Sequence, residues 1–436
     1  MFINMPVTEH IYRTEEVGTA CTGVFINAYC NYPLLQGMRI NLYKCVLENG
    51  FSMMSEKGCM GLLHPETIYD DPKGQPLRKE VYPRLRYHFQ YTNELTLFAE
   101  VDHHTKYGEQ IYGGKQESID FLSIHNLFHP STIDACFVHD GHGICGGIKD
   151  DNGKWNVNAH KDRIVHFTET ELRVLSEAFE DGADWQSVKL TSVHANGIIK
   201  TLEAFSSFAT HVGDLSENVI VSEGLNETTS VDKGWMTRNV KYPVLDKMEL
   251  IYSGPHFFVG NPLYKTPKSV CELNSDYDII DINQISDDFC PRTNYIPLIG
   301  LPEFRSIVQG FMLGQDSDGK PIYDDWTKYY HVGFRRMVGP TSERTLSGAI
   351  LMKNCNHIGG VVSTTFKDYN KLIEFAGLTH SVVLDFYIKT LGVMDIHASR
   401  VYPFPLGISD KYKPALFSRT LLLNCLTTHY ADLWQE

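Results

Sequence analysis

The sequence predicts an α/β fold in its first part and an α+β fold in the rest of its 436 residues. Up to about residue 114, helical spacings of apolar residues alternate with short apolar strands, which is typical of helices layered on a sheet. Between residues 215 and 330, short strands alternate with turns rich in Pro and Gly, which indicates a β-rich module. A chain of this length is expected to form two or three domains.

The first part begins with a helix and a strand. Apolar residues recur at near-helical spacing over residues 36–51, and a short apolar run over 59–63 ends at His64-Pro65. A charged stretch at 77–89 predicts a second helix, and residues 95–101 and 107–112 predict two more strands.

Helix-capping residues and alternating apolar residues predict the helices and strands after residue 168. Thr168 and Glu171 form a capping box, which predicts that a helix begins there. An amphipathic helix is expected at 198–212. Short strands are expected at 219–221, 250–252, 256–259, 346–352 and 360–364, and one long helix at 369–391.

Composition limits the possible partners. The formal net charge of −14 argues against indiscriminate nucleic-acid binding, because Lys and Arg supply most of the non-specific affinity for phosphate. A local basic cleft remains compatible with that charge. Ten scattered cysteines without a C-x-x-C motif favour reduced thiols in a cytoplasmic protein. No apolar stretch approaches the length of a membrane span, and no secretory signal is expected.

One run near the end of the chain carries the most specific signal. It reads Thr341-Ser342-Glu343-Arg344-Thr345-Leu346 and follows Phe334-Arg335-Arg336. These residues resemble the segment FR…(N/T)-x-E-R-T-L of large adenine-specific DNA methyltransferases that carry a C-terminal target-recognition domain. Those enzymes belong to type IIG restriction–modification and BREX-type phage-exclusion systems.

Further runs resemble the same family in the same order along most of the chain. They are residues 35–37, 41–44, 61–66, 84–90, 93–98, 254–262 and 291–295. The resemblance implies that residues 1–114 form the trailing part of a class I methyltransferase-like sheet. It also implies a connecting helical region at 115–214 and a mixed β-rich and helical target-recognition domain at 215–436.

The sequence departs from the family where the chemistry should lie. The family needs a glycine-rich S-adenosylmethionine loop and an (N/D)-P-P-(Y/F/W) tetrapeptide that holds a flipped adenine. Asn261-Pro262-Leu263-Tyr264 lacks the second proline, and the glycine-rich run 141–147 leads into a turn instead of a helix. We therefore expect no catalytic, cofactor or metal site in this chain, and S-adenosylmethionine on a catalytic partner.

Ten residues are candidates for contact with double-stranded DNA. Guanidinium groups bind phosphates and guanine in a bidentate manner, and Asn suits adenine. The candidates are Arg335, Arg336, Ser342, Arg344, Thr345, Arg292, Asn294, Tyr295, Lys265 and Lys268. The alternatives are buried arginines that fix the domain, an ordinary loop with a packed tyrosine at 291–297, and solvated lysines. We expect Arg336 to contact a phosphate. We expect Arg344 to be structural, because it lies just before Leu346, where the chain enters an apolar segment.

The expected function is therefore DNA recognition for an adenine-specific (N6) methyltransferase in restriction–modification or phage defence. Its partners would be double-stranded DNA and a catalytic subunit or N-terminal half, in the cytoplasm and away from membranes. A related alternative is an inactive remnant of such an enzyme. An alternative of another class is a metal-dependent hydrolase, because His and Asp suit divalent metals and the chain carries His103, His104, His139, Asp140 and His142.

Overall fold

The computed structural model describes residues 6–39, 41–180, 184–208, 210–339, 342–391 and 393–435. The chain divides into two compact units, Met1–Ser206 and Ser207–Glu436. Unit 1 contains α1 (Pro6–Asn27), α2 (Leu42–Met53), β1 (Cys59–Pro65), α3 (Thr67–Asp70), α4 (Gln75–Val81), β2 (Leu85–Thr92), β3 (Lys106–Gly113), β4 (Phe121–Leu127), α5 (Ser131–Val138), β5 (Val165–Phe167), α6 (Glu169–Phe179) and α7 (Asn196–Ser206).

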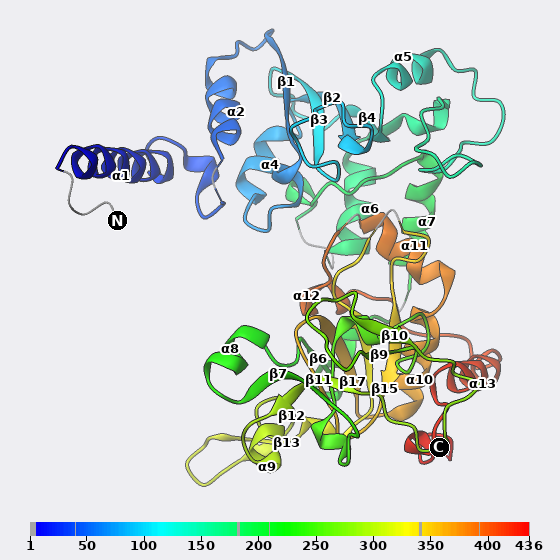
Figure 1. The fold of residues 1–436 in the computed structure, drawn as a ribbon. Coiled ribbons are helices and arrows are strands. Elements are labelled where there is room, and N and C mark those ends of the chain that lie inside the picture. Colours follow the sequence, from blue (N-terminus) through cyan, green and yellow to red (C-terminus); the bar gives the residue numbers. More distant parts are fainter. Residues whose placement is uncertain are drawn as a thin grey trace. The chain divides into compact units, whose positions relative to one another are not determined.

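Unit 1 is built on one mixed sheet with the strand order β1-β3-β2-β4-β5. β3 runs antiparallel to both of its neighbours, β1 and β2, so β1 and β2 are parallel to each other. β4 is parallel to β2, and β5 is antiparallel to β4. Figure 1 shows β1, β3, β2 and β4 side by side. One of the unit's core clusters packs Tyr91 and Tyr107 against Ile124, Leu127 and Cys136.

Several predictions for unit 1 are confirmed and two are wrong. β1 and β3 lie where strands were expected, and the Thr168–Glu171 capping box opens α6. The helix expected at 77–89 ends at Val81, because Pro83 follows and the chain then enters β2. The strand expected at 95–101 is a compact loop, because the Asn93 side chain binds backbone groups of Phe98 and Val101.

The division of the chain also differs from the expected one. The boundary expected after residue 114 falls within the sheet, because β4 pairs with β2 across it. The boundary between the two units lies after Ser206, eight residues before the expected position at 214. No helix in the described part of the chain is long and apolar enough to cross a membrane.

Unit 2 holds several small sheets and a group of helices. Its elements are β6 (Val219–Ser222), α8 (Glu227–Asp232), β7 (Met236–Lys241), β8 (Ile251–Tyr252), β9 (Lys265–Pro267), β10 (Tyr277–Ile279), β11 (Thr293–Pro297), α9 (Leu301–Arg305), β12 (Gln309–Gln315), β13 (Pro321–Asp325), β14 (His331–Arg335), β15 (Gly348–Leu351), β16 (Asn356–His357), β17 (Val361–Phe366), α10 (Tyr369–Thr379), α11 (Val382–Leu391), α12 (Ala398–Val401) and α13 (Lys413–Asn424).

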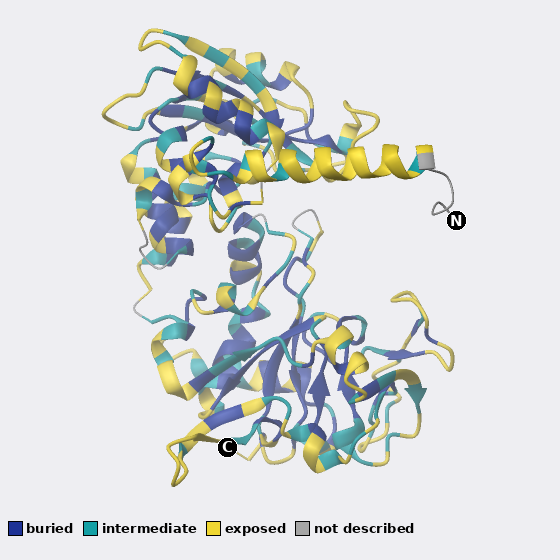
Figure 2. Ribbon diagram, turned by 90° about the vertical axis from the view of Figure 1, so that its left-hand side faces the viewer, coloured by how far each residue is buried: buried dark blue, intermediate teal, exposed yellow. Residues whose placement is uncertain are grey.

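The centre of unit 2 is the four-stranded sheet β15-β14-β17-β6. Every residue of β15 and β17 is buried, and Figure 2 shows dark blue strands at the centre of this unit. The ring of Phe375 on α10 lies 5.8 Å from the ring of Phe334 and 5.3 Å from that of Phe366. The apolar face of α10 therefore covers this sheet.

Two predictions for unit 2 need correction. The long helix expected at 369–391 is two helices, α10 and α11, because the Ser381 hydroxyl accepts a hydrogen bond from the Leu384 amide and caps α11. The strand expected at 256–259 is absent, and a 3-10 turn at Gly254–His256 opens this segment because Ser253 and His256 cap it reciprocally.

Candidate nucleic-acid interface

Arg335 is the last residue of β14, the strand that pairs with β15 on one side and β17 on the other. Its amide donates to the Ser347 carbonyl at 2.9 Å, which fixes the backbone at the end of the sheet. The side chain is exposed, and no carboxylate among the described residues forms an ion pair with it. Its guanidinium is therefore available to an outside anion such as a phosphate.

Arg336 occupies a different environment. Its Nε lies 2.9 and 3.1 Å from the two carboxylate oxygens of Asp395, and Nη1 lies 3.4 Å from a Glu223 oxygen. The same Nη1 donates to the Gly359 carbonyl at 3.3 Å. The hydrogen bond to Asp395 raises the pKa of Arg336 above its usual value. To contact a phosphate, as the sequence predicts, Arg336 would have to leave these carboxylates.

The segment that follows is anchored to α11. The Asp385 carboxylate oxygen Oδ1 accepts the amides of Thr345 at 2.8 Å and Leu346 at 2.7 Å. Arg344 donates from Nη2 to the His380 carbonyl at 3.0 Å, and its Nε lies 3.6 Å from Asp385. These contacts favour a structural role for Arg344 and Thr345. Ser342 is exposed, and Thr341 lies outside the described residues.

The Arg292–Tyr295 candidates are largely interior. Asn294 and Tyr295 are each 3% exposed. The Tyr277 hydroxyl donates to Asn294 at 3.4 Å, and Tyr295 joins a core cluster with Met236. Arg292 donates to the Pro267 carbonyl at 3.1 Å. The packed-tyrosine alternative therefore fits this stretch better than contact with a base edge.

Lys265 and Lys268 lie at β9, which pairs with β10 in an antiparallel ribbon. Lys268 is exposed and Lys265 is half-buried. Within the described ranges, neither ammonium group forms an ion pair with a carboxylate. With Arg335, these lysines are the predicted residues whose charges remain open to a phosphate.

A buried polar network in unit 1 was not predicted. Glu66 accepts hydrogen bonds from His88 at 2.9 Å, Gln90 at 3.1 Å and Gln110 at 2.8 Å. His88 also contacts the Ser123 hydroxyl at 2.8 Å. Burial raises the pKa of Glu66, but His88 and Gln90 outweigh it and hold that pKa below its usual value. His88 and Gln90 on β2, Gln110 on β3 and Ser123 on β4 are all buried, so this network ties the three strands together.

One feature of the sequence could have indicated this network. His88, Gln90 and Thr92 recur at every second position of β2, and all three side chains are buried. Polar residues at every second position indicate a strand with one polar face, because alternate side chains of a strand point to opposite faces. A search for alternating apolar residues does not find such a strand.

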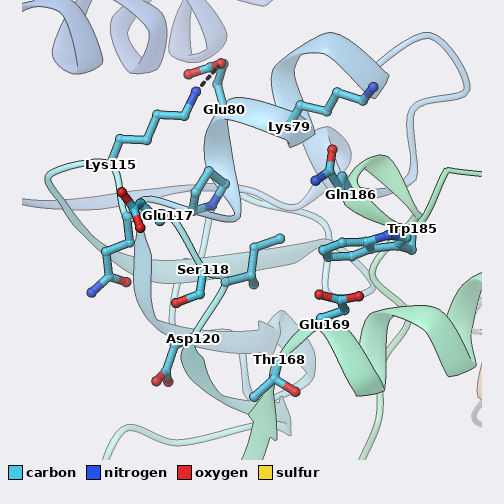
Figure 3. Close-up of a pocket in the computed structure, with 13 residues that line it drawn as sticks. Lys79, Glu80, Lys115, Glu117, Ser118, Asp120, Thr168, Glu169, Trp185 and Gln186 are labelled. Carbon is cyan, nitrogen blue, oxygen red and sulfur yellow. Dashed lines mark hydrogen bonds and ion pairs between the residues drawn. The ribbon is translucent and has the colours of Figure 1, made fainter.

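A cavity of about 650 Å³ opens in unit 1 beside α6 (Figure 3). Two lysines and four carboxylates line it. The lysines are Lys79 and Lys115, and the carboxylates are Glu80, Glu117, Asp120 and Glu169. Both lysines are already paired, Lys115 with Glu80 at 2.8 Å and Lys79 with Asp184 at 2.5 Å. The excess of negative charge makes this cavity unsuitable for nucleic acid.

The five-residue histidine group does not assemble. His103 and His104 lie beside Glu94, whereas the ring of His139 lies 4.6 Å from that of His160. Among the described residues, Glu94, His103 and His104 are the one group of three that could hold a metal ion. The hydrolase alternative therefore loses the shared site on which it was based.

No family model and no curated protein matches this sequence. Among solved structures, the chain is similar to the type IIL restriction-modification enzyme MmeI, solved in complex with DNA, with a TM-score of 0.39 and 9% identity. That match covers 87% of this chain and 43% of MmeI. The type IIG restriction endonuclease BpuSI matches with a TM-score of 0.27 and 10% identity, over 89% of this chain and 44% of BpuSI. The chain spans less than half the length of either enzyme.

Proposed function

We propose that this chain is the sequence-specific DNA-recognition part of an adenine-specific (N6) DNA methyltransferase of a restriction–modification or phage-defence system. Unit 2 binds the target duplex. The residues that bind S-adenosylmethionine and the flipped adenine belong to a catalytic subunit or an N-terminal half, because the sequence contains neither motif.

One observation carries this proposal. β3 is inserted antiparallel between the parallel strands β1 and β2, within the segment whose sequence resembles the methyltransferases. The resemblance implies that this segment is the trailing part of a methyltransferase-like sheet, and a sheet of mixed strand direction is present there. β1 also ends the strand order, so its other edge has no ladder partner among the described residues. An open edge offers backbone donors and acceptors to a further strand, which supports a sheet completed by the catalytic part.

The DNA-contacting charges of the proposal are Arg335, Lys265 and Lys268. Each carries a positive charge without an ion-pair partner in the described part of the chain. The net charge of −14 repels the negatively charged DNA backbone, so binding should depend on a few local contacts made by these cations. Loss of one such contact should then be measurable.

Replacement of Arg335 by Ala is expected to weaken binding to a random-sequence duplex and to flatten its salt dependence. Each phosphate contact contributes a slope of about −0.9 in log K against log salt concentration. Fluorescence anisotropy of a labelled duplex over a range of salt concentrations would measure both quantities. The Lys265→Ala/Lys268→Ala variant should lose up to about twice that slope.

Lys328→Ala provides the matched control. Lys328 is an exposed cation of the same unit, but its ammonium group is already paired with Asp324 at 2.7 Å. Its removal should leave the slope unchanged. If Arg335→Ala and the double lysine variant keep the salt slope of the original chain, these residues do not contact DNA.

A further inference from the structure

The loop between β2 and β3 brings together three side chains with metal-binding atoms. The Nδ1 atom of His103 lies 3.0 Å from one carboxylate oxygen of Glu94, and Nδ1 of His104 lies 3.3 Å from the other. One ligand atom from each residue lies within 4.8 Å of the other two. Zn–N and Zn–O bonds are about 2.0–2.2 Å long, so two ligand atoms of one ion lie at most about 4.4 Å apart. The two nitrogen-to-oxygen distances are within that limit, and a small adjustment of the exposed imidazoles would place all three atoms around one ion.

The loop is held in shape by residues outside this group. The Asn93 side chain donates to the carbonyls of Phe98 and Val101, each at 2.9 Å, and accepts the Phe98 amide at 3.1 Å. The Asp102 carboxylate accepts the His104 amide at 2.8 Å. The three ligand atoms therefore converge on a braced loop, which lowers the entropy cost of binding an ion.

The group combines one carboxylate that is nearly buried with two imidazoles that are open to solvent. The Glu94 side chain is only 6% exposed, whereas those of His103 and His104 are 52% and 57% exposed. A carboxylate this far from solvent is stabilised by a positive partner or by hydrogen-bond donors. The two imidazole rings lie 3.8 Å apart, so both rings border the same space beside the carboxylate. A divalent ion would neutralise the carboxylate and could take one nitrogen from each of the two neighbouring rings.

We propose that Glu94, His103 and His104 bind one divalent transition-metal ion of the zinc class. Two imidazole nitrogens and one carboxylate oxygen suit Zn²⁺ or Co²⁺ better than Mg²⁺ or Ca²⁺, which prefer oxygen ligands. The exposed imidazoles leave the fourth position open to water. This site shares no residue with the DNA-contacting residues proposed above, all of which lie in unit 2.

The test is titration of the full chain with Co²⁺ and Zn²⁺. Visible absorption would report cobalt coordination, and competition with a chromogenic chelator would give the affinity for zinc. We expect one ion per chain. His103→Ala and His104→Ala should each weaken binding by more than the roughly 10- to 100-fold that loss of an outer-shell partner costs.

Controls separate this site from other histidines. His139→Ala and His142→Ala change the other histidines of the five-residue group that the sequence suggested, and both should leave affinity and stoichiometry unchanged. His103 and His104 are exposed, so their replacement should keep the circular dichroism spectrum of the original chain. Absence of binding by the original chain, or equal binding by the His103→Ala/His104→Ala double variant, would overturn the assignment.

Discussion

Acidification from pH 7.5 to pH 5 is expected to lower the free energy of unfolding of both units by several kcal/mol. Burial depresses the pKa of five interior imidazoles, His125 to about 3 and His194, His256, His357 and His380 to about 4. In the folded protein these rings stay neutral until the pH approaches those values. Once the chain unfolds, the same rings take up protons near pH 6.5.

The direction of this change in unfolding free energy follows from which state binds more protons. Between about pH 6.5 and pH 4 the unfolded chain holds more protons, so stability falls as the pH falls. At pH 5 each group lies about 1.5 units below its unfolded pKa, which corresponds to about 2 kcal/mol. Two of these groups lie in unit 1 and three in unit 2, so the losses should be about 4 and 6 kcal/mol. Such losses approach the whole stability of an ordinary domain.

Urea unfolding followed by circular dichroism at pH 7.5, 6 and 5 would measure the effect. The midpoint should fall steadily below pH 6.5. His129 is exposed, so His129→Ala should show the same pH dependence as the original chain. A midpoint that stays constant from pH 7.5 to pH 5 would mean that these imidazoles are not held neutral by burial.

Replacement of Asp385 by Ala is expected to destabilise unit 2 by about 3 kcal/mol. The carboxylate is 6% exposed, accepts the amides of Thr345 and Leu346, and pairs with Arg344 at 3.6 Å. Alanine would leave two amides without an acceptor and one guanidinium without its counter-charge. A loss of this size should lower the Tm by roughly 6–12 °C for a unit of this length.

Asp385→Asn separates the contribution of the two amide hydrogen bonds from that of the ion pair with Arg344. Both amides bond to the same oxygen, Oδ1, and an asparagine can present an oxygen there while removing the charge. The Asn variant should therefore lose only about 1 kcal/mol. Calorimetry of the two variants would compare them. Equal stability of Asp385→Ala and the original chain would show that Asp385 does not anchor the 344–346 segment.

Local signals account for the elements that the sequence predicts well. The apolar run of β1 and the Thr168–Glu171 capping box depend on neighbours a few residues away, and both lie where they were expected. The first residues of β2 fell within the helix expected at 77–89. The inner face of β2 carries His88 and Gln90, whose burial is compensated by hydrogen bonds to Glu66. That pairing joins residues far apart in the sequence, so no local pattern contains it.

The same limit applies to the candidate site. Asn294 and Tyr295 look like base-reading side chains, but β11 pairs with β7 and buries them. Arg335 and Arg336 are adjacent in the sequence and have different surroundings, one exposed and one held by Asp395 and Glu223. The position of Asp395, 59 residues away, decides which of the two charges stays open.

The most direct test of DNA recognition is selection of duplexes from a random-sequence library by the purified chain, followed by sequencing of the bound fraction. The proposed function predicts enrichment of one short motif that contains an adenine. It also predicts that a duplex with this motif binds at least about 10³-fold more tightly than the unselected library at the same salt concentration. Repeated selection that enriches no motif, or equal binding of selected and unselected duplexes, would contradict the account.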